Sequence, residues 1–253
     1  AMMGLSIWIV LGSFLQYFFT VPSSYSYIKK NISQSLFKST IFSPNVRKML
    51  GPLLLAMIGV GAVQINTAVD ALFARYADSS GPSYLWYAIR IQQLPIALLG
   101  LALSAAIIPP LVRCIKNEEN ETAEQLVYLS LKRATVMMIP FTIGIFLCGM
   151  ASVNVLYGRG AFSESSGIET TKCLIAYSIG ILPTVLISIL SVIYYAKNNY
   201  KTPAVFSICA VGVNILLNSV FIFVLGMGSV SVALASSIAS CLNAIFLYSF
   251  LDI

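Results

Sequence analysis

The chain has 253 residues, of which 58% are hydrophobic and only 9% are charged, and its mean hydropathy is +0.88. Soluble domains carry about 25% charged residues, so this composition argues against a water-soluble globule and for a protein that crosses a membrane several times. The absence of histidine excludes imidazole-based catalysis and histidine-ligated metals. The five cysteines are scattered without CxxC spacing, which argues against a zinc site or a disulfide framework.

Seven apolar stretches are each long enough to cross a membrane, which takes a helix of about 20 residues. These stretches are continuously apolar, whereas the strands of a membrane β-barrel alternate apolar and polar residues. They therefore predict an all-α fold, a polytopic transmembrane helix bundle with seven spans. In chain order, the predicted spans are Ala1–Val21, Gly51–Phe73, Leu85–Leu111, Val136–Leu156, Cys173–Ala196, Pro203–Leu225 and Ser229–Leu251.

Basic residues predict the orientation of these spans. Most of the lysine and arginine lies in the loops that follow the first, third and fifth spans, and such loops face the cytoplasm. The first span is therefore expected to enter from outside, and the C-terminus to lie in the cytoplasm. The net charge of +6 reflects this bias and does not indicate nucleic-acid binding. The basic residues of these loops are Lys29, Lys30, Lys38, Arg47, Lys48, Arg113, Lys116, Lys132, Arg133, Lys197 and Lys201.

Two ionisable side chains lie within the apolar spans, Asp70 in the second and Arg90 in the third. Each would cost about 2.5–3.5 kcal/mol at the centre of a membrane helix, so such residues almost always face a bundle interior or a water-filled cavity. At about 1.5 Å per residue, both lie at similar depths in the outer half of the bundle. We expect them to pair with one another, to serve a functional site, or to do both.

Polar side chains on two other spans fall close to the predicted depth of Asp70. Asn214 and Asn218 share one face of the sixth span, and Ser236 lies on the seventh. Converging carboxylate, amide and hydroxyl oxygens are the ligands that a hard cation such as Na⁺ requires, so these four residues form a predicted sodium site. The alternative is that the amides and hydroxyls only hold the helices together.

Three further polar residues accompany this group. Asn66 lies one turn before Asp70 on the same face of its span. Ser240 and Asn243 continue the polar stripe of the seventh span, but they have no partner at matching depth. We therefore interpret Ser240 and Asn243 as helix–helix contacts.

Arg90 is suited to a different ligand. Its guanidinium is permanently charged and presents a planar fork that fits phosphate oxygens, so in a membrane cavity it would suit an anionic head group. Gln93 lies one turn further along and joins Arg90 as a predicted substrate-binding residue. Trp86 and Tyr87 are interpreted as aromatic-belt residues at the outer interface.

Helix breakers interrupt three of the predicted spans. Proline inside a membrane helix frees backbone groups and kinks the helix, and kinked spans are common in transporters that change conformation. The breakers are Pro95, Gly100, Pro109 and Pro110 in the third span, Pro140 and Gly144 in the fourth, and Gly180 and Pro183 in the fifth.

One stretch of the chain resembles a known family. Residues 81–95 read Gly-Pro-Ser-Tyr-Leu-Trp-Tyr-Ala-Ile-Arg-Ile-Gln-Gln-Leu-Pro, and Ala-Leu-Ser over 102–104 and Pro109 follow. This string resembles the signature of the MurJ/MviN family, bacterial lipid II flippases of the multidrug/oligosaccharidyl-lipid/polysaccharide exporter superfamily. Residues 156–162 (Leu-Tyr-Gly-Arg-Gly-Ala-Phe), 194–203 and 233–237 (Ala-Leu-Ala-Ser-Ser) are similar to later segments of the family, in the same order.

The resemblance implies a fourteen-helix protein of which this chain supplies the C-terminal half. Residues 1–21 would be the transmembrane helix that ends the first lobe, residues 22–50 a cytoplasmic amphipathic linker or a plain solvated one, and residues 51–253 the six-helix second lobe. The N-terminal lobe of the same protein would then be the missing partner. An odd number of spans that begins on the outer side fits this expectation.

The resemblance also implies transport of lipid II, the undecaprenyl-diphosphate-linked peptidoglycan precursor, across the bacterial inner membrane by alternating access. Arg90 matches a cavity arginine that engages the diphosphate. Asp70 and Asn214 match the sodium site of some family members, Ser236 matches its hydroxyl, and Asn218 replaces a second carboxylate. Because this replacement leaves one negative charge, sodium is expected to bind more weakly, or a proton to couple in its place.

Two other functions are weighed against this one. A drug or polysaccharide exporter of the same superfamily fits the composition but not the signature around Arg90. A membrane-embedded enzyme acting on polyprenyl phosphates would need clustered carboxylates or a histidine, and the acidic run at 118–124 has no accompanying nucleophile or metal motif. We therefore expect a transporter and not an enzyme, with no cofactor except Na⁺ as coupling ion, and with lipid II and membrane lipids as its partners.

Overall fold

The computed structural model describes residues 10–22, 25 and 44–251. The chain divides into two compact units, Ala1–Gly51 and Pro52–Ile253. In the first unit an apolar helix covers Val10–Pro22. The start of the first predicted span and most of the linker predicted over residues 22–50 lie outside the described residues.

Residues 44–251 are helical with short connections, and this part of the chain contains no strand. Five of its helices are long and apolar enough to cross a membrane, and one bent pair makes a sixth span. The predicted all-α transmembrane bundle is confirmed, and six of its seven predicted spans have counterparts here. They are α2 (Pro44–Ala77); α3 (Gly81–Pro95) with the π-helix η2 (Ile96–Gly100) and α4 (Leu101–Lys116); α5 (Asn120–Tyr157); α6 (Glu164–Ser178) with α7 (Ile181–Ala196); α8 (Lys201–Ser219) with the π-helix η3 (Val220–Val224); and α9 (Val230–Ser249).

Three interruptions occur in the helices of residues 44–251: the π-helices η2 and η3, and the break between α6 and α7. The predicted helix breakers account for two of them. Pro95 has no backbone N–H to continue the α-helical bonding, and η2 begins directly after it. α6 and α7 meet at Gly180 with a bend of 42°. α5, in contrast, continues as one α-helix through Pro140. The π-helix η3 has no proline or glycine and was not predicted.

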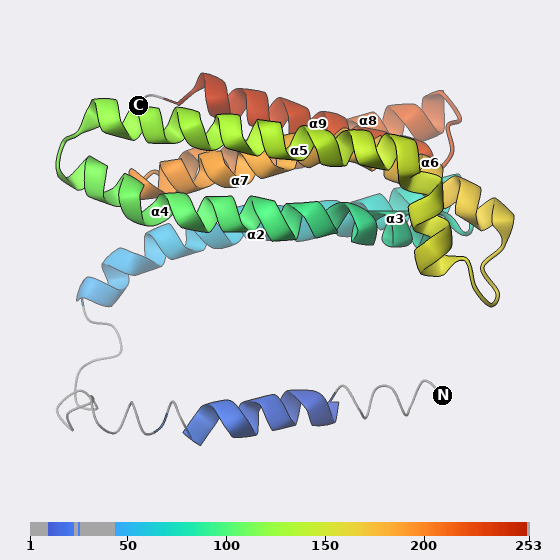
Figure 1. The fold of residues 1–253 in the computed structure, drawn as a ribbon, viewed down its shortest axis with the longest axis horizontal. Coiled ribbons are helices and arrows are strands. Elements are labelled where there is room, and N and C mark those ends of the chain that lie inside the picture. The colour runs from blue at the N-terminus through green and yellow to red at the C-terminus, as the bar shows by residue number, and fades with distance from the viewer. Residues whose placement is uncertain (1–9, 23–24, 26–43, 252–253) are drawn as a thin grey trace. The chain divides into compact units, whose positions relative to one another are not determined.

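The long helices lie side by side, with α4 and α5 joined at one end of the bundle and α5 and α6 at the other (Figure 1). α7 lies at the centre of the packing and contacts α4, α5 and α9. Its fully buried side chains, Val185, Ile189 and Ile193, recur every four residues and so form one stripe. α9 offers mostly small buried residues, which let neighbouring helices approach closely.

Candidate cation site and the adjoining cavity

The Asp70 carboxylate is the centre of a hydrogen-bonded cluster that joins α2, α8 and α9. Asn218 Nδ2 donates to Asp70 Oδ1 at 2.9 Å, while Ser236 Oγ and Asn66 Nδ2 donate to Oδ2 at 2.6 and 3.0 Å. Only 6% of Asp70 is exposed. Each hydrogen bond to a charged group contributes about 1.5–3 kcal/mol, so these three donors offset the desolvation of the carboxylate.

Two asparagines close the cluster into a ring. Asn214 and Asn218 are one turn apart on α8, and Asn218 Nδ2 also donates to Asn214 Oδ1 at 2.8 Å. Asn214 Nδ2 in turn donates to Ser236 Oγ at 2.9 Å. Both asparagines are fully buried, and the structure brings all four residues of the predicted sodium site into contact.

The donor set of this cluster fits a monovalent cation. Asn218 Oδ1 is buried and accepts no hydrogen bond, so one amide oxygen remains available as a ligand. Asp70 supplies one carboxylate, and nowhere in the described residues do three His, Cys, Asp or Glu side chains gather as a divalent metal would require. Asp70, Asn214, Asn218 and Ser236 are therefore the residues that would hold sodium.

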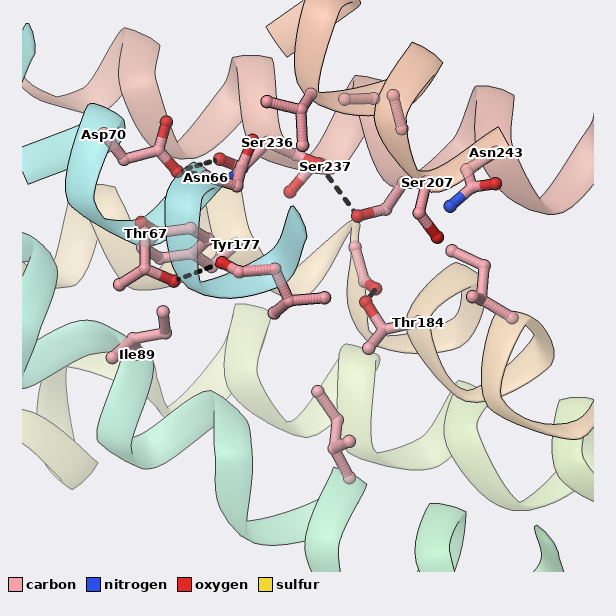
Figure 2. A pocket seen from close by; sticks show the side chains of 18 of the residues that line it. Asn66, Thr67, Asp70, Ile89, Tyr177, Thr184, Ser207, Ser236, Ser237 and Asn243 are labelled. Carbon is pink, nitrogen blue, oxygen red and sulfur yellow. Dashed lines mark hydrogen bonds between the residues drawn. The ribbon is translucent and has the colours of Figure 1, made fainter. Parts of the chain in front are cut away.

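A cavity of about 440 Å³ adjoins the cluster and is lined by residues of α2, α3, η2, α6, α7, α8 and α9. Asp70, Asn66 and Ser236 line one end of it, and Ser207 and Asn243 lie at the other (Figure 2). Among the described residues, Asp70 is the only charged side chain in the lining, although serine, threonine, asparagine and glutamine recur along the wall. Most of the lining surface is apolar, and these polar groups interrupt it.

Arg90 lies apart from the Asp70 cluster. It is exposed, it does not line the cavity, and no ion pair joins it to Asp70. Its Cζ instead lies 4.8 Å from the centre of the Trp86 ring, and Nη1 donates to Gln93 Oε1 at 3.3 Å. The position of Arg90 on its helix explains why it does not line the cavity. Ile89 and Gln93, four residues apart, share the face of α3 that lines the cavity, and Arg90 is rotated by about 100° from Ile89.

Sequence reasoning missed a second polar group beside the cluster, at the break between α6 and α7. The break leaves backbone carbonyls without helical partners. Gln92 Nε2 donates to the Tyr177 carbonyl at 2.8 Å, and Ser237 Oγ donates to the Ala176 carbonyl at 2.8 Å. The signal in the sequence was Gly180, but nothing there indicates which distant side chains cap the break.

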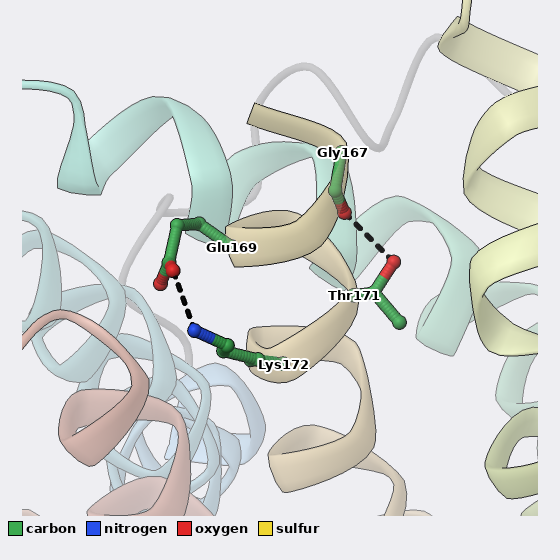
Figure 3. A network of polar contacts seen from close by, with 4 residues as sticks. All are labelled: Gly167, Glu169, Thr171 and Lys172. Carbon is green, nitrogen blue, oxygen red and sulfur yellow. Dashed lines mark hydrogen bonds and ion pairs between the residues drawn. The ribbon is translucent and has the colours of Figure 1, made fainter. Parts of the chain in front are cut away.

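Polar contacts on the remaining surface of α6 are local to that helix. Lys172 Nζ pairs with Glu169 Oε1 at 2.7 Å, and Thr171 Oγ1 donates to the Gly167 carbonyl at 2.8 Å (Figure 3). An ion pair three residues apart on an accessible helix surface contributes little to stability, and none of these residues lines the cavity.

Comparison with known proteins identifies the family. The family model "Lipid II flippase MurJ" matches residues 1–252. The protein named "Probable lipid II flippase MurJ" of Chlamydia muridarum is 33% identical over 237 residues, which cover 94% of this chain and 43% of that protein. Its Vibrio cholerae serotype O1 counterpart is 30% identical over 245 residues, which cover 97% of this chain and 46% of that protein.

Solved structures agree with this assignment. "Lipid II flippase MurJ, inward closed conformation" superposes with a TM-score of 0.70 at 29% identity, covering 89% of this chain and 47% of that one. An outward-facing MATE family multidrug transporter of the MOP superfamily shares the fold, with a TM-score of 0.67 at 16% identity over 79% of this chain. The chain thus spans a little under half the length of these relatives. Because the family model matches almost every residue, this chain belongs to the lipid II flippase MurJ family.

Proposed function

We propose that this chain forms the C-terminal part of a transporter that carries lipid II from the inner to the outer leaflet of the bacterial inner membrane. The observation that carries the proposal is the family match over residues 1–252. A cavity of about 440 Å³, with polar side chains in a mostly apolar lining, lies between helices long enough to span the membrane and supports it. The drug or polysaccharide exporter alternative has only the shared fold in its favour.

We further propose that transport proceeds by alternating access and is coupled to a monovalent cation at Asp70. A bound sodium ion would supply the positive charge that offsets this buried carboxylate. Asp70 is contributed by α2, Asn214 and Asn218 by α8, and Ser236 by α9. Because the ring of hydrogen bonds among these side chains spans three helices, any rearrangement that turns their oxygens toward a cation also changes how α2 contacts α8 and α9.

On the substrate side, Arg90 and Gln93 would contact the head group. The Arg90 guanidinium is exposed and forms no ion pair with any described carboxylate, so its donors remain available to a diphosphate. Gln93 connects this arginine to the cavity, because it contacts Arg90 and lines the wall.

The substitution Asp70→Asn in the full-length native protein tests cation coupling. Reconstituted protein is assayed for lipid II flipping with and without a sodium gradient. We expect the wild type to respond to sodium and Asp70→Asn to lose that response, because the neutral amide removes the only charge of the site.

Asp78→Asn is the matched control, since Asp78 follows the end of α2, lies outside the cavity and accepts a hydrogen bond from the Ser80 backbone. This control should retain the sodium response. A wild-type protein that flips lipid II independently of sodium would refute sodium coupling. A wild-type protein that flips no lipid II would refute the proposed substrate.

A further inference from the structure

An exposed tryptophan on α3 is held in place by a group of aromatic rings. Trp86 is 54% exposed, and its ring packs edge-to-face with Tyr87, with 5.4 Å between the ring centres. Tyr87 in turn packs against Tyr157 at 4.7 Å and Phe162 at 5.5 Å, and the Tyr157 hydroxyl donates to the Tyr87 carbonyl at 3.4 Å. These contacts tie α3 to the end of α5 and to the loop that follows α5. An aromatic anchor in the membrane interface needs no such support, whereas a ring that binds a ligand gains affinity from being held in place.

The same ring lies beside the arginine that we assign to the head group. Arg90 follows Trp86 by one helical turn, and its Cζ lies 4.8 Å from the centre of the Trp86 ring. In a polyprenyl-diphosphate-linked saccharide, the first sugar is bonded to the outer phosphate of the diphosphate. A diphosphate bound by Arg90 therefore brings this sugar within reach of the indole, which lies about 6 Å away along the helix.

A small pocket lies beside Trp86, between α2 and α3. Its volume is about 80 Å³, which is room for a group of a few heavy atoms. Trp86 forms part of its lining, together with Thr67 and Ala71 of α2 and Leu85 and Ile89 of α3. Most of the lining surface is apolar, so the pocket suits a small apolar substituent such as the methyl end of an acyl group.

A sugar ring and an indole have complementary surfaces. The C–H groups on one face of a pyranose form an apolar patch with a slight positive charge, and the face of an aromatic ring is slightly negative. The two surfaces attract one another, while the sugar hydroxyls at the edge of the contact keep their hydrogen bonds to water or to polar side chains. No further charged group is required beside Trp86.

We propose that Trp86 packs against the sugar bonded to the diphosphate, and that the pocket beside the ring accepts a small acyl substituent of this sugar. The proposal rests on the lipid II transport proposed above and deepens it. Arg90 recognises the diphosphate, and Trp86 recognises the saccharide. Trp86 is then a specificity-determining residue, because it distinguishes a diphosphate lipid that carries a sugar from one that does not.

The test compares two lipids on the purified full-length native protein: lipid II, and undecaprenyl diphosphate, which lacks the sugar. Trp86→Leu should lower the affinity for lipid II about tenfold and leave the affinity for undecaprenyl diphosphate within about twofold. Trp86→Tyr keeps an aromatic face and should stay within about threefold of the wild type for both lipids. Ala71→Leu fills the pocket from an exposed position on α2, and it should weaken the binding of lipid II alone.

Tyr76→Leu is the matched control. Tyr76 is an exposed aromatic residue near the end of α2, its ring packs against Phe223, and it lines neither this pocket nor the larger cavity. If Tyr76→Leu weakens lipid II as much as Trp86→Leu does, Trp86 is only one of several interfacial anchors and the proposal is wrong.

The comparison of the two lipids separates this proposal from the proposed function. The sugar contact is refuted if Trp86→Leu and Ala71→Leu bind lipid II as the wild type does. It is equally refuted if Trp86→Leu weakens both lipids alike, since the indole then acts only through Arg90 or the fold. In either case lipid II transport still stands. A wild-type protein that binds neither lipid would instead overturn the proposed substrate.

Discussion

At the scale of single residues, a shift of one position along a helix separates the cavity wall from the surface. Ile89 and Gln93 line the cavity, whereas Arg90 stacks on Trp86 and is exposed. Trp86 is four residues before Arg90, so the two share one helix face. The aromatic ring therefore orients the guanidinium without neutralising it.

This arrangement predicts how substitutions of Arg90 affect lipid II. Arg90→Ala in the full-length native protein should lower lipid II affinity by about tenfold to a hundredfold, because it removes charge-assisted hydrogen bonds to the diphosphate. The lipid II affinity of Arg90→Lys should fall between those of the wild type and Arg90→Ala, since lysine keeps the charge and loses the planar fork. Binding is measured with purified lipid II, and growth of flippase-depleted cells is a second readout.

Arg159→Ala is the control for Arg90→Ala. Arg159 is also exposed, and its Nη2 donates to the Val155 carbonyl near the end of the preceding helix, α5. If this control weakens lipid II binding as much as Arg90→Ala does, the effect is one of general surface charge and Arg90 has no particular role.

Counting residues from the ends of the predicted spans placed the cation cluster well. Asp70, Asn218 and Ser236 were assigned similar depths, and hydrogen bonds join them. Depth depends only on the rise per residue, so it can be estimated from sequence. Rotation about the helix axis is harder to estimate, because an apolar span has no solvent-facing side to fix its phase. This is why depth alone left open whether Arg90 pairs with Asp70, and the structure shows no ion pair between them.

At the scale of helices, the break between α6 and α7 is held by side chains from other spans. Gly180 was recognised as a breaker, and it is also required by packing: a Cβ there would lie 2.9 Å from Ser237 Oγ. Gln92 from α3 and Ser237 from α9 cap the carbonyls that the break exposes. Such long-range partners are outside the reach of local sequence patterns, whereas the break itself is a local property of the chain.

Substituting Gln92 tests how much this capping contributes. Gln92→Leu should lower the free energy of unfolding by about 0.5–1.5 kcal/mol, because the Tyr177 carbonyl loses one of its two donors and keeps the Gly180 backbone N–H. The measurement is reversible unfolding of the full-length native protein in detergent. The adjacent Gln93→Leu is the control, since Gln93 is exposed and donates to no backbone carbonyl.

An equal loss of stability in Gln92→Leu and Gln93→Leu would contradict the capping role. A loss confined to Gln92→Leu would support it, and would also be expected to disturb the cation cluster. Tyr177 and Asp70 line the same cavity, so a shift of α6 changes the wall next to the carboxylate.

At the scale of the whole molecule, the distribution of basic residues and the arrangement of helices make a joint prediction of topology. The connection between α4 and α5 and the connection between α5 and α6 lie at opposite ends of the bundle (Figure 1). Arg113 and Lys116 precede the first of these, which is therefore predicted to be cytoplasmic. The second, which contains Arg159, is predicted to face the outside.

Single cysteines in these two connections test that orientation. In a full-length native protein whose cysteines are replaced, including the five of this chain, Arg159→Cys should react with a membrane-impermeant maleimide added to intact spheroplasts. Asn117→Cys should react only after the membrane is permeabilised, because α5 carries the chain across the bilayer between the two positions. The reverse labelling pattern would invert the bundle, and it would place the Asp70 end of the cavity nearer the cytoplasm than the Asn243 end.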